Sequence, residues 1–286
     1  MVVQKSMTPT QPNLRPVPRS VMAPEEQRAR AIELEALLED RLAARAETFP
    51  CGTALFNDAH PRAGSLNVLR VESGTPPLDA DALMQFADEL QAGLPQRSLR
   101  VVDDERADQL RPGFAAAGWV VGSLTLMAPR RLPDRPIDIT AVTQVELDEL
   151  LQAREGTMRN QHRDLDTAEQ LLAAGGLPAD GVELRCFAAR IGTEVAAYAV
   201  ARVTGEVAKI TELDAFARAH GSGLGRAVVW GAVSALRREG ARLVVVEAED
   251  DTWPKWTFRR LGFEDIGNTH RFVRPWGDES VSAPAI

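Results

Sequence analysis

The same sequence pattern occurs twice in this chain of 286 residues. Residues 114–119 read F-A-A-A-G-W and residues 258–263 read F-R-R-L-G-F, so the two copies start 144 residues apart (258 minus 114). The same offset aligns the preceding stretches without a gap: Leu99 with Leu243, Val101 with Val245, and the helix-like segment 80–92 with 224–236. Solenoid repeats are only about 20–50 residues long, so this period indicates a duplicated domain. The alternative is that any two strand–helix–strand units look alike at this level.

The length of the chain allows two domains of ordinary size. The stretch PRRLPDRPID (129–138) is rich in proline and charge and has no periodicity, which is typical of an interdomain linker. Residues 1–23 contain four prolines and no apolar region of a secretion signal, so we expect a flexible tail there. We therefore predict four parts: a tail (1–23), two domains (24–130 and 131–275) and a C-terminal tail (276–286).

Apolar periodicity predicts alternating helices and strands, which is an α/β composition. In the first half it predicts a long helix over residues 25–49. In the second half it predicts helices over 144–155, 167–176 and 224–239, and strands over 183–191, 195–203, 207–216 and 242–249.

Composition limits the kinds of partner. The net charge of −8 and the pI of about 5.2 disfavour nucleic acid, because the molecule as a whole repels phosphate. No run of 18 apolar residues is present, so we expect no membrane helix and a cytoplasmic protein. Two cysteines and four histidines without metal-ligand spacing give no reason to expect a zinc site.

The segment FARAHGSGLGRA (216–227) carries the strongest chemical signal. Between a predicted strand and a predicted helix, every second residue is a glycine: Gly221, Gly223 and Gly225. Glycine allows a positive φ and a close approach of backbone amides to a ligand, and amides at a helix N-terminus bind phosphate. Cationic character comes from three neighbours: Arg218, His220 and Arg226. The spacing matches neither the P-loop nor the dinucleotide-binding G-x-G-x-x-G motif.

Within residues 140–275, the order of strand, glycine loop, helix, strand and a helix ending in F-R-R-L-G-F resembles the GNAT superfamily of N-acetyltransferases. The family loop reads Arg/Gln-x-x-Gly-x-Gly/Ala, and here His220 replaces the Arg or Gln. The resemblance implies that this half binds acetyl-coenzyme A (acetyl-CoA), with the pyrophosphate held by the loop: His220, Gly221, Ser222, Gly223, Leu224, Gly225 and Arg226. It also implies the fold, which is two GNAT-like domains, each with a mixed, mainly antiparallel twisted sheet flanked by helices.

The resemblance implies further contacts with the cofactor. The strand end at Leu213, Asp214 and Ala215 would splay from its neighbour, and its free backbone groups would bind the pantetheine arm and polarise the thioester carbonyl. Asp251 lies where the family often has an Asn that contacts pantetheine; the alternative is that Asp251 or Thr252 caps the following helix.

Phe258 is the main departure from the family pattern. It lies at the cofactor where many members have a tyrosine that protonates the leaving thiolate, and a phenyl ring cannot donate a proton. Either the thiolate leaves without being protonated, or water or another residue protonates it, or the domain is a poor catalyst. A non-catalytic acyl-CoA-binding module, or a scaffold that binds no small molecule, therefore stays open beside the enzyme.

Two carboxylates are candidates for the base that deprotonates an amine acceptor. Glu212, and after it Asp214, lie on one face of the strand before the predicted splay, with Leu213 on the other face. The alternative is that they only attract a cationic substrate. The prediction is acetyl transfer from acetyl-CoA to a primary amine by direct attack. Small amines, aminoglycoside-like drugs, amino acids and protein N-termini all stay open as acceptors.

The corresponding loop of the first half, residues 73–79 (SGTPPLD), lacks these features. Its two prolines remove amide donors, and its aspartate would repel phosphate. We predict a degenerate copy without a cofactor loop. Its expected roles are to cover one side of the cleft, to shape the acceptor pocket or to mediate homodimerisation.

Overall fold

The computed structural model describes residues 22–162, 164–216, 219, 221–250 and 252–275. The first half of the chain contains three helices and five strands: α1 (Pro24–Leu42), β1 (Arg45–Phe49), β2 (Gly52–Phe56), β3 (Val68–Val71), α2 (Ala80–Leu90), β4 (Gln96–Val101), α3 (Asp104–Ala116) and β5 (Val120–Pro129). The second half contains β6 (Val142–Val145), the short 3-10 helix η1 (Leu147–Leu150), α4 (Leu151–Gln161), α5 (Leu165–Gly176), β7 (Glu183–Ile191), β8 (Glu194–Thr204), β9 (Val207–Ala215), α6 (Leu224–Arg238), β10 (Leu243–Glu249), α7 (Trp253–Arg260) and β11 (Phe263–Pro275).

The strands form one mixed, mainly antiparallel sheet of eleven strands in the order β1-β2-β3-β4-β11-β5-β10-β9-β8-β7-β6. Each half contributes one parallel pair, β3 with β4 and β9 with β10, and the connection between the paired strands contains α2 or α6. The element order strand, helix, strand, helix, strand is therefore the same in both halves, as the repeat at an offset of 144 residues predicted.

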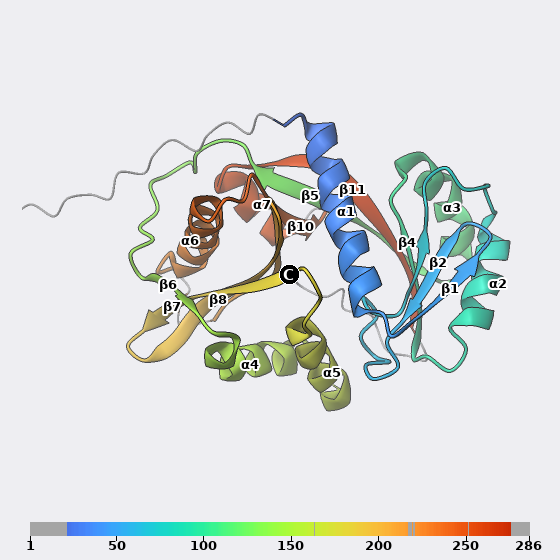
Figure 1. The fold of residues 1–286 in the computed structure, drawn as a ribbon, viewed down its shortest axis with the longest axis horizontal. Coiled ribbons are helices and arrows are strands. Elements are labelled where there is room, and N and C mark those ends of the chain that lie inside the picture. Colours follow the sequence, from blue (N-terminus) through green and yellow to red (C-terminus); the bar gives the residue numbers. More distant parts are fainter. Residues whose placement is uncertain (1–21, 163, 217–218, 220, 251, 276–286) are drawn as a thin grey trace, which may run out of the picture.

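The last strand of each half pairs with the other half. β11 lies between β4 and β5, and β5 lies between β11 and β10. Figure 1 shows these two long strands crossing the middle of the molecule, between α2 and α3 on one side and α6 on the other, with α1 lying across them. The two halves thus share a continuous sheet. The domain boundary between residues 130 and 131 stays a prediction.

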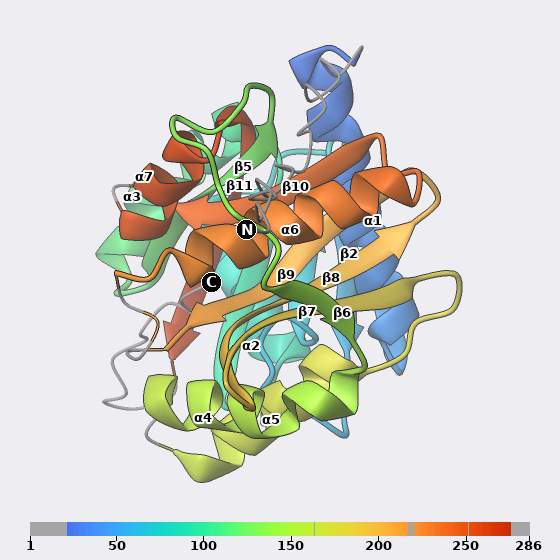
Figure 2. The same ribbon diagram turned by 90° about the vertical axis from the view of Figure 1, so that its left-hand side faces the viewer.

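Helices cover both faces of the sheet (Figures 1 and 2). On one face, α2 and α3 cover the first half, and α6 and α7 cover the second. On the opposite face α1 contacts β9 and β11 and so lies across the junction, while α4 and α5 contact each other beside β9. This second face, between α1 and the pair α4 and α5, is where the two halves meet around open space.

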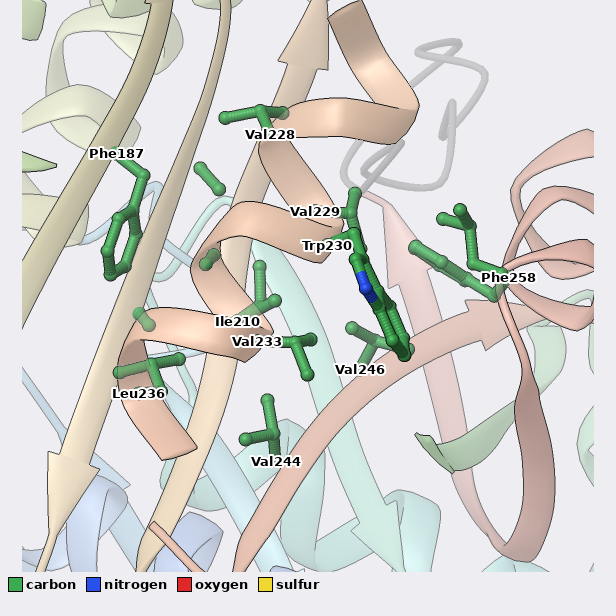
Figure 3. Packing of buried hydrophobic residues seen from close by; sticks show 14 of the residues in the cluster. Phe187, Ile210, Val228, Val229, Trp230, Val233, Leu236, Val244, Val246 and Phe258 are labelled. Atoms are coloured by element: carbon green, nitrogen blue, oxygen red, sulfur yellow. The ribbon is translucent and has the colours of Figure 1, made fainter. Parts of the chain in front are cut away.

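The largest core cluster lies between α6, α7 and the second half of the sheet. Trp230, Val233 and Val246 lie at its centre, and Phe258 closes it from α7 (Figure 3). α6 buries nine of its 15 residues, seven of them in the consecutive run 227–233, so its middle is covered on all sides and its position on the sheet is fixed. That packing sets the position of the glycine loop at its N-terminus.

Two local predictions were wrong. The helix predicted over residues 25–49 ends at Leu42, and Arg45–Phe49 forms β1, which pairs with β2 through a tight turn. The helix predicted over 144–155 is replaced by β6, η1 and the start of α4. No helix among the described residues is both long enough and apolar enough to cross a membrane.

Candidate functional site

The glycine loop has a backbone conformation that glycine adopts more easily than any other residue. Gly221 has a φ of 77° and Gly223 a φ of 80°, both in the left-handed region. Gly223 is the N-cap of α6, and it has no side chain with which to cap the helix. A Cβ added to Gly225 would lie 3.0 Å from the Cβ of Ala215, so the loop folds tightly against the end of β9.

The N-terminus of α6 fits an anionic group. The amides of a first helical turn have no intrahelical acceptor, and the helix dipole favours negative charge there. The Ser222 hydroxyl donates to the Ala219 carbonyl (2.6 Å) and accepts a longer bond from the Leu224 amide (3.3 Å), which shapes the loop. In the described part of the chain, the Nε of Arg226 is buried without a hydrogen-bond partner. Two cationic residues of the sequence prediction, Arg218 and His220, lie outside the described residues.

β9 and β10 diverge where the sequence predicted a splay. Their parallel pairing ends at Lys209 and Val245, although β9 continues to Ala215 and β10 to Glu249. The Phe216 amide donates to the Ala196 carbonyl of β8, so alternation turns the amides of Leu213 and Ala215 toward the gap. The Ala215 amide is taken by the Asp214 carboxylate (2.7 Å). The backbone of β9 facing the gap is thus suited to an extended polar chain.

A β-bulge sets the direction of the two predicted carboxylates. The pairing of β8 with β9 shifts between Val200 and Ala201, so Thr211 is an extra residue in β9. After the bulge Leu213 packs into the core below α6, and Glu212 and Asp214 face α4. The two candidate bases therefore share one face, as alternation predicted.

Both predicted bases are hydrogen-bonded. Glu212 receives two bonds of 2.7 Å from Arg154, whose side chain is only 3% exposed. Asp214 accepts a 2.6 Å bond from the Thr157 hydroxyl. Because each carboxylate oxygen can accept more than one hydrogen bond, Glu212 can still accept from a substrate while it is bonded to Arg154. Sequence reasoning missed Arg154 as a partner, because nothing in the local pattern links α4 to β9.

A cavity of about 480 Å³ lies between the two halves, on the face covered by α1, α4 and α5. Its lining includes both sides of the β9–β10 divergence, among them Glu212 and Glu249. β4, β5 and β11 line the opposite side. Tyr198, the only tyrosine of the chain, lines it from β8, and burial raises the pKa of this phenol well above its usual value, which keeps it protonated. Sequence reasoning missed Glu249, because its alternation with Glu247 reads as an ordinary buried strand.

Two further predicted cofactor residues are placed differently or not described. Phe258 is 1% exposed and packs against Phe263, with ring centroids 5.5 Å apart, inside the core of Figure 3. Its role at a cofactor stays a prediction. Asp251 lies outside the described residues. Thr252 is the N-cap residue of α7, but its hydroxyl donates to the Glu249 carbonyl rather than accepting from a helix amide.

The corresponding region of the first half is closed by its own side chains. Asp79 caps α2 by accepting from the Ala82 amide (2.9 Å). Arg106 donates to the Thr75 hydroxyl (3.0 Å) and to the Pro76 carbonyl (3.1 Å), which ties the loop to α3. Because the N-terminus of α2 already has a carboxylate bound to it, it has little left with which to bind a second anion.

No protein-family model and no curated protein matches the sequence, whereas solved structures match its fold. A GCN5-related N-acetyltransferase from Kribbella flavida is 17% identical with a TM-score of 0.59, over 88% of this chain and 96% of that one. A tandem GNAT protein from the clavulanic acid biosynthesis pathway is 17% identical with a TM-score of 0.50, over 93% and 98%. A functionally unknown protein from Staphylococcus epidermidis is 13% identical with a TM-score of 0.60, over 82% and 94%.

The chain has the fold of the GNAT superfamily, in the tandem arrangement. The predicted fold class is confirmed. Identities of 13–17% establish the fold alone, so the activity is argued from the geometry of this chain.

Proposed function

We propose that the second half binds acetyl-CoA and that the protein transfers the acetyl group to a primary amine by direct attack. One observation carries this proposal: β9 and β10 diverge directly beside the N-terminus of α6, where the N-cap is a glycine in the left-handed region. The helix N-terminus suits the pyrophosphate, and the free edge of β9 suits the amide-containing pantetheine arm. Arg226, with its unpartnered buried Nε in the described part of the chain, adds a donor beside the loop.

Bound in this way, acetyl-CoA supplies the acetyl group as a thioester. The Leu213 amide faces the gap and is in place to donate a hydrogen bond to the thioester carbonyl, where negative charge develops. A carboxylate on the cavity side takes a proton from the acceptor's ammonium group, and the freed amine forms the amide bond as the bond to sulfur breaks. The sulfur keeps that electron pair, and its protonation does not involve Phe258, because a phenyl ring has no proton to give.

Both oxygens of each predicted base already accept a hydrogen bond. Asp214 has one oxygen bonded to Thr157 and the other to the Ala215 amide, and Glu212 is held by Arg154 through both oxygens. Each of these oxygens can accept a further hydrogen bond, so a substrate competes with the present donors but does not have to displace them. A non-catalytic acyl-CoA-binding module is the second candidate, favoured by these bonds and by the buried Phe258.

Thiol release distinguishes the two candidates. The full chain is mixed with acetyl-CoA and a panel of primary amines, and free coenzyme A thiol is measured over time. Release that depends on an amine supports transfer. Binding of acetyl-CoA without release by any amine would leave the non-catalytic module, and no binding would overturn both.

A further inference from the structure

Among the described residues, the charged side chains that line the cavity between the two halves are paired or hydrogen-bonded, with two exceptions. Five carboxylates and five Lys or Arg side chains of this part of the chain line it. Four of the carboxylates have a cationic partner: Glu35 with Lys209, Glu39 with Arg100, Glu212 with Arg154 and Glu247 with Lys209. Two more lining cations are bonded elsewhere, Arg62 to Asp164 and Arg202 to the carbonyls of Leu177 and Gly175.

The exceptions are Glu249 and Arg271. Within the described part of the chain, neither side chain has an ion pair or hydrogen bond, although both line the same cavity. Arg271 does act on Glu35 at longer range: burial raises the pKa of Glu35, but Lys209, Arg100 and Arg271 outweigh burial and hold that pKa at about 2. Glu35 is, however, bonded to Lys209. One anion and one cation are therefore left available to a ligand.

Sheet register places these two charges on either side of an open floor. Arg271 of β11 is directly opposite Gly122 of β5, and Glu249 of β10 is opposite Leu124 of β5. The two side chains thus extend from strands separated by β5, with backbones about 12 Å apart, from two strand spacings and a two-residue offset along β5. A Cβ added to Gly122 would meet nothing within 4 Å, so the floor between the charges is open.

We propose that the acceptor is an amino acid, whose carboxylate binds Arg271 and whose ammonium group binds Glu249. This rests on the proposed function, and it names the substrate class. Glutamate and arginine each extend several ångströms from the backbone, which leaves a gap that a compound with amine and carboxylate close together can bridge. A planar guanidinium with free donors is the side chain best suited to a carboxylate.

The same placement gives Glu249 a part in the reaction. It ends β10 beyond the point where β9 and β10 diverge, and it lines the cavity into which the gap between the strands opens. Its carboxylate takes the proton from the ammonium group and passes it to solvent. The amine nitrogen then bonds to the acyl carbon, the carbon–sulfur bond breaks, and the second nitrogen proton goes to the leaving thiolate.

The test compares free amino acids with the corresponding amino acid amides, which keep the amine but lack the carboxylate. Thermal stability is measured on the full chain with saturating acetyl-CoA and each compound, and thiol release is measured in parallel. We expect at least one free amino acid to add a thermal shift and to be acetylated about 10- to 100-fold more efficiently than its amide, the range expected for hydrogen bonds to a charged group.

Arg271→Gln is expected to remove this preference, because it should lower kcat/KM for the amino acid about 10- to 100-fold more than kcat/KM for the amide. Gly122→Val fills the floor and is expected to abolish the shift by the amino acid but not the shift by acetyl-CoA. Arg274→Gln is the matched control, because Arg274 is on the same strand but bonds to Asp88 on the opposite face.

The outcomes distinguish the acceptor class from the cofactor site. If acetyl-CoA alone gave no thermal shift with the unchanged chain, that result would contradict the proposed function. Normal acetyl-CoA binding with equal use of amino acids and amides, or with no added shift from any amino acid, would overturn the amino acid acceptor and leave cofactor binding standing.

Discussion

The two halves of the sheet start from the same geometry and then differ. Each has three residue pairs in its parallel ladder, 69–71 with 99–101 and 207–209 with 243–245, and the segments of β4 and β10 in these ladders are equivalent under the 144-residue offset. In the first half β4 ends at Val101, and α3 begins at Asp104. In the second half β10 continues to Glu249 and diverges from β9. In the first half both strands end with the last pair of the ladder, at Val71 and Val101, whereas in the second half both continue past it, which opens a gap between them.

The N-caps of the helices that connect the two strands of each parallel pair also differ. The N-cap of α2 is Asp79, whose carboxylate caps the helix, whereas the N-cap of α6 is Gly223, which lies in the left-handed region and has no side chain. Under the proposed function, these differences at the strand ends and helix N-termini give an anion site to one half and not to the other. Equivalent aromatic residues pack in the core of both halves.

That shared packing predicts the largest effect. Phe114 and Phe258 are equivalent under the 144-residue offset, are buried, and face equivalent aromatic partners, Trp119 at 4.9 Å and Phe263 at 5.5 Å between ring centroids. Phe114→Ala and Phe258→Ala should each lower the free energy of unfolding by about 3–5 kcal/mol, because each leaves a cavity. Urea denaturation measures this. A much smaller effect of Phe258→Ala would show that its ring is not a core residue.

The second-largest expected effect is a difference between the two halves in stabilisation by acetyl-CoA. Gly223 and Gly74 both have positive φ, 80° and 76°, and a Cβ added to either would meet nothing within 4 Å. Gly223→Val and Gly74→Val should therefore strain the backbone similarly. Only Gly223→Val should abolish the stabilisation by acetyl-CoA, about 2.7 kcal/mol at 100 times the dissociation constant. Thermal unfolding with and without acetyl-CoA measures both, and equal loss in the two variants would contradict the assignment of the loop.

The smallest effect concerns the cap of α2. Asp79→Ala removes the bond to the Ala82 amide and should lower the free energy of unfolding by about 1 kcal/mol. It should not create a second acetyl-CoA site, since Pro76 and Pro77 still lack amide donors and Arg106 still closes the loop. Denaturation and binding titration on the same variant check the two statements, and a gained site would show that the carboxylate alone blocks the first half.

The features that repeat or alternate were predictable from the sequence. The 144-residue offset anticipated the paired order of elements. The run from β7 to β10 was assigned because its strands are short apolar runs separated by glycine turns and its helix is amphipathic. A splay at residues 213–215 was implied by the resemblance to the family, and the pairing of β9 with β10 ends earlier, at Lys209. β1 was missed because Arg45–Phe49 is polar and almost fully exposed, so only its pairing with β2 makes it a strand.

Features that depend on contacts between distant segments were not predictable. The exchange of β5 and β11 between the halves is a choice of strand partner, which local patterns do not encode. The same holds for the bonds between Arg154 and Glu212, which restrict the favoured base, and for the open charges of Glu249 and Arg271. Each becomes visible only once the sheet register is known.

The central claim is that one half of this duplicated fold binds acetyl-CoA and the other does not. The stoichiometry of binding, measured by calorimetric titration of the full chain with acetyl-CoA, tests it most directly. We predict one molecule per chain, and none for Gly223→Val. Two molecules per chain, or one that persists in Gly223→Val, would contradict the claim.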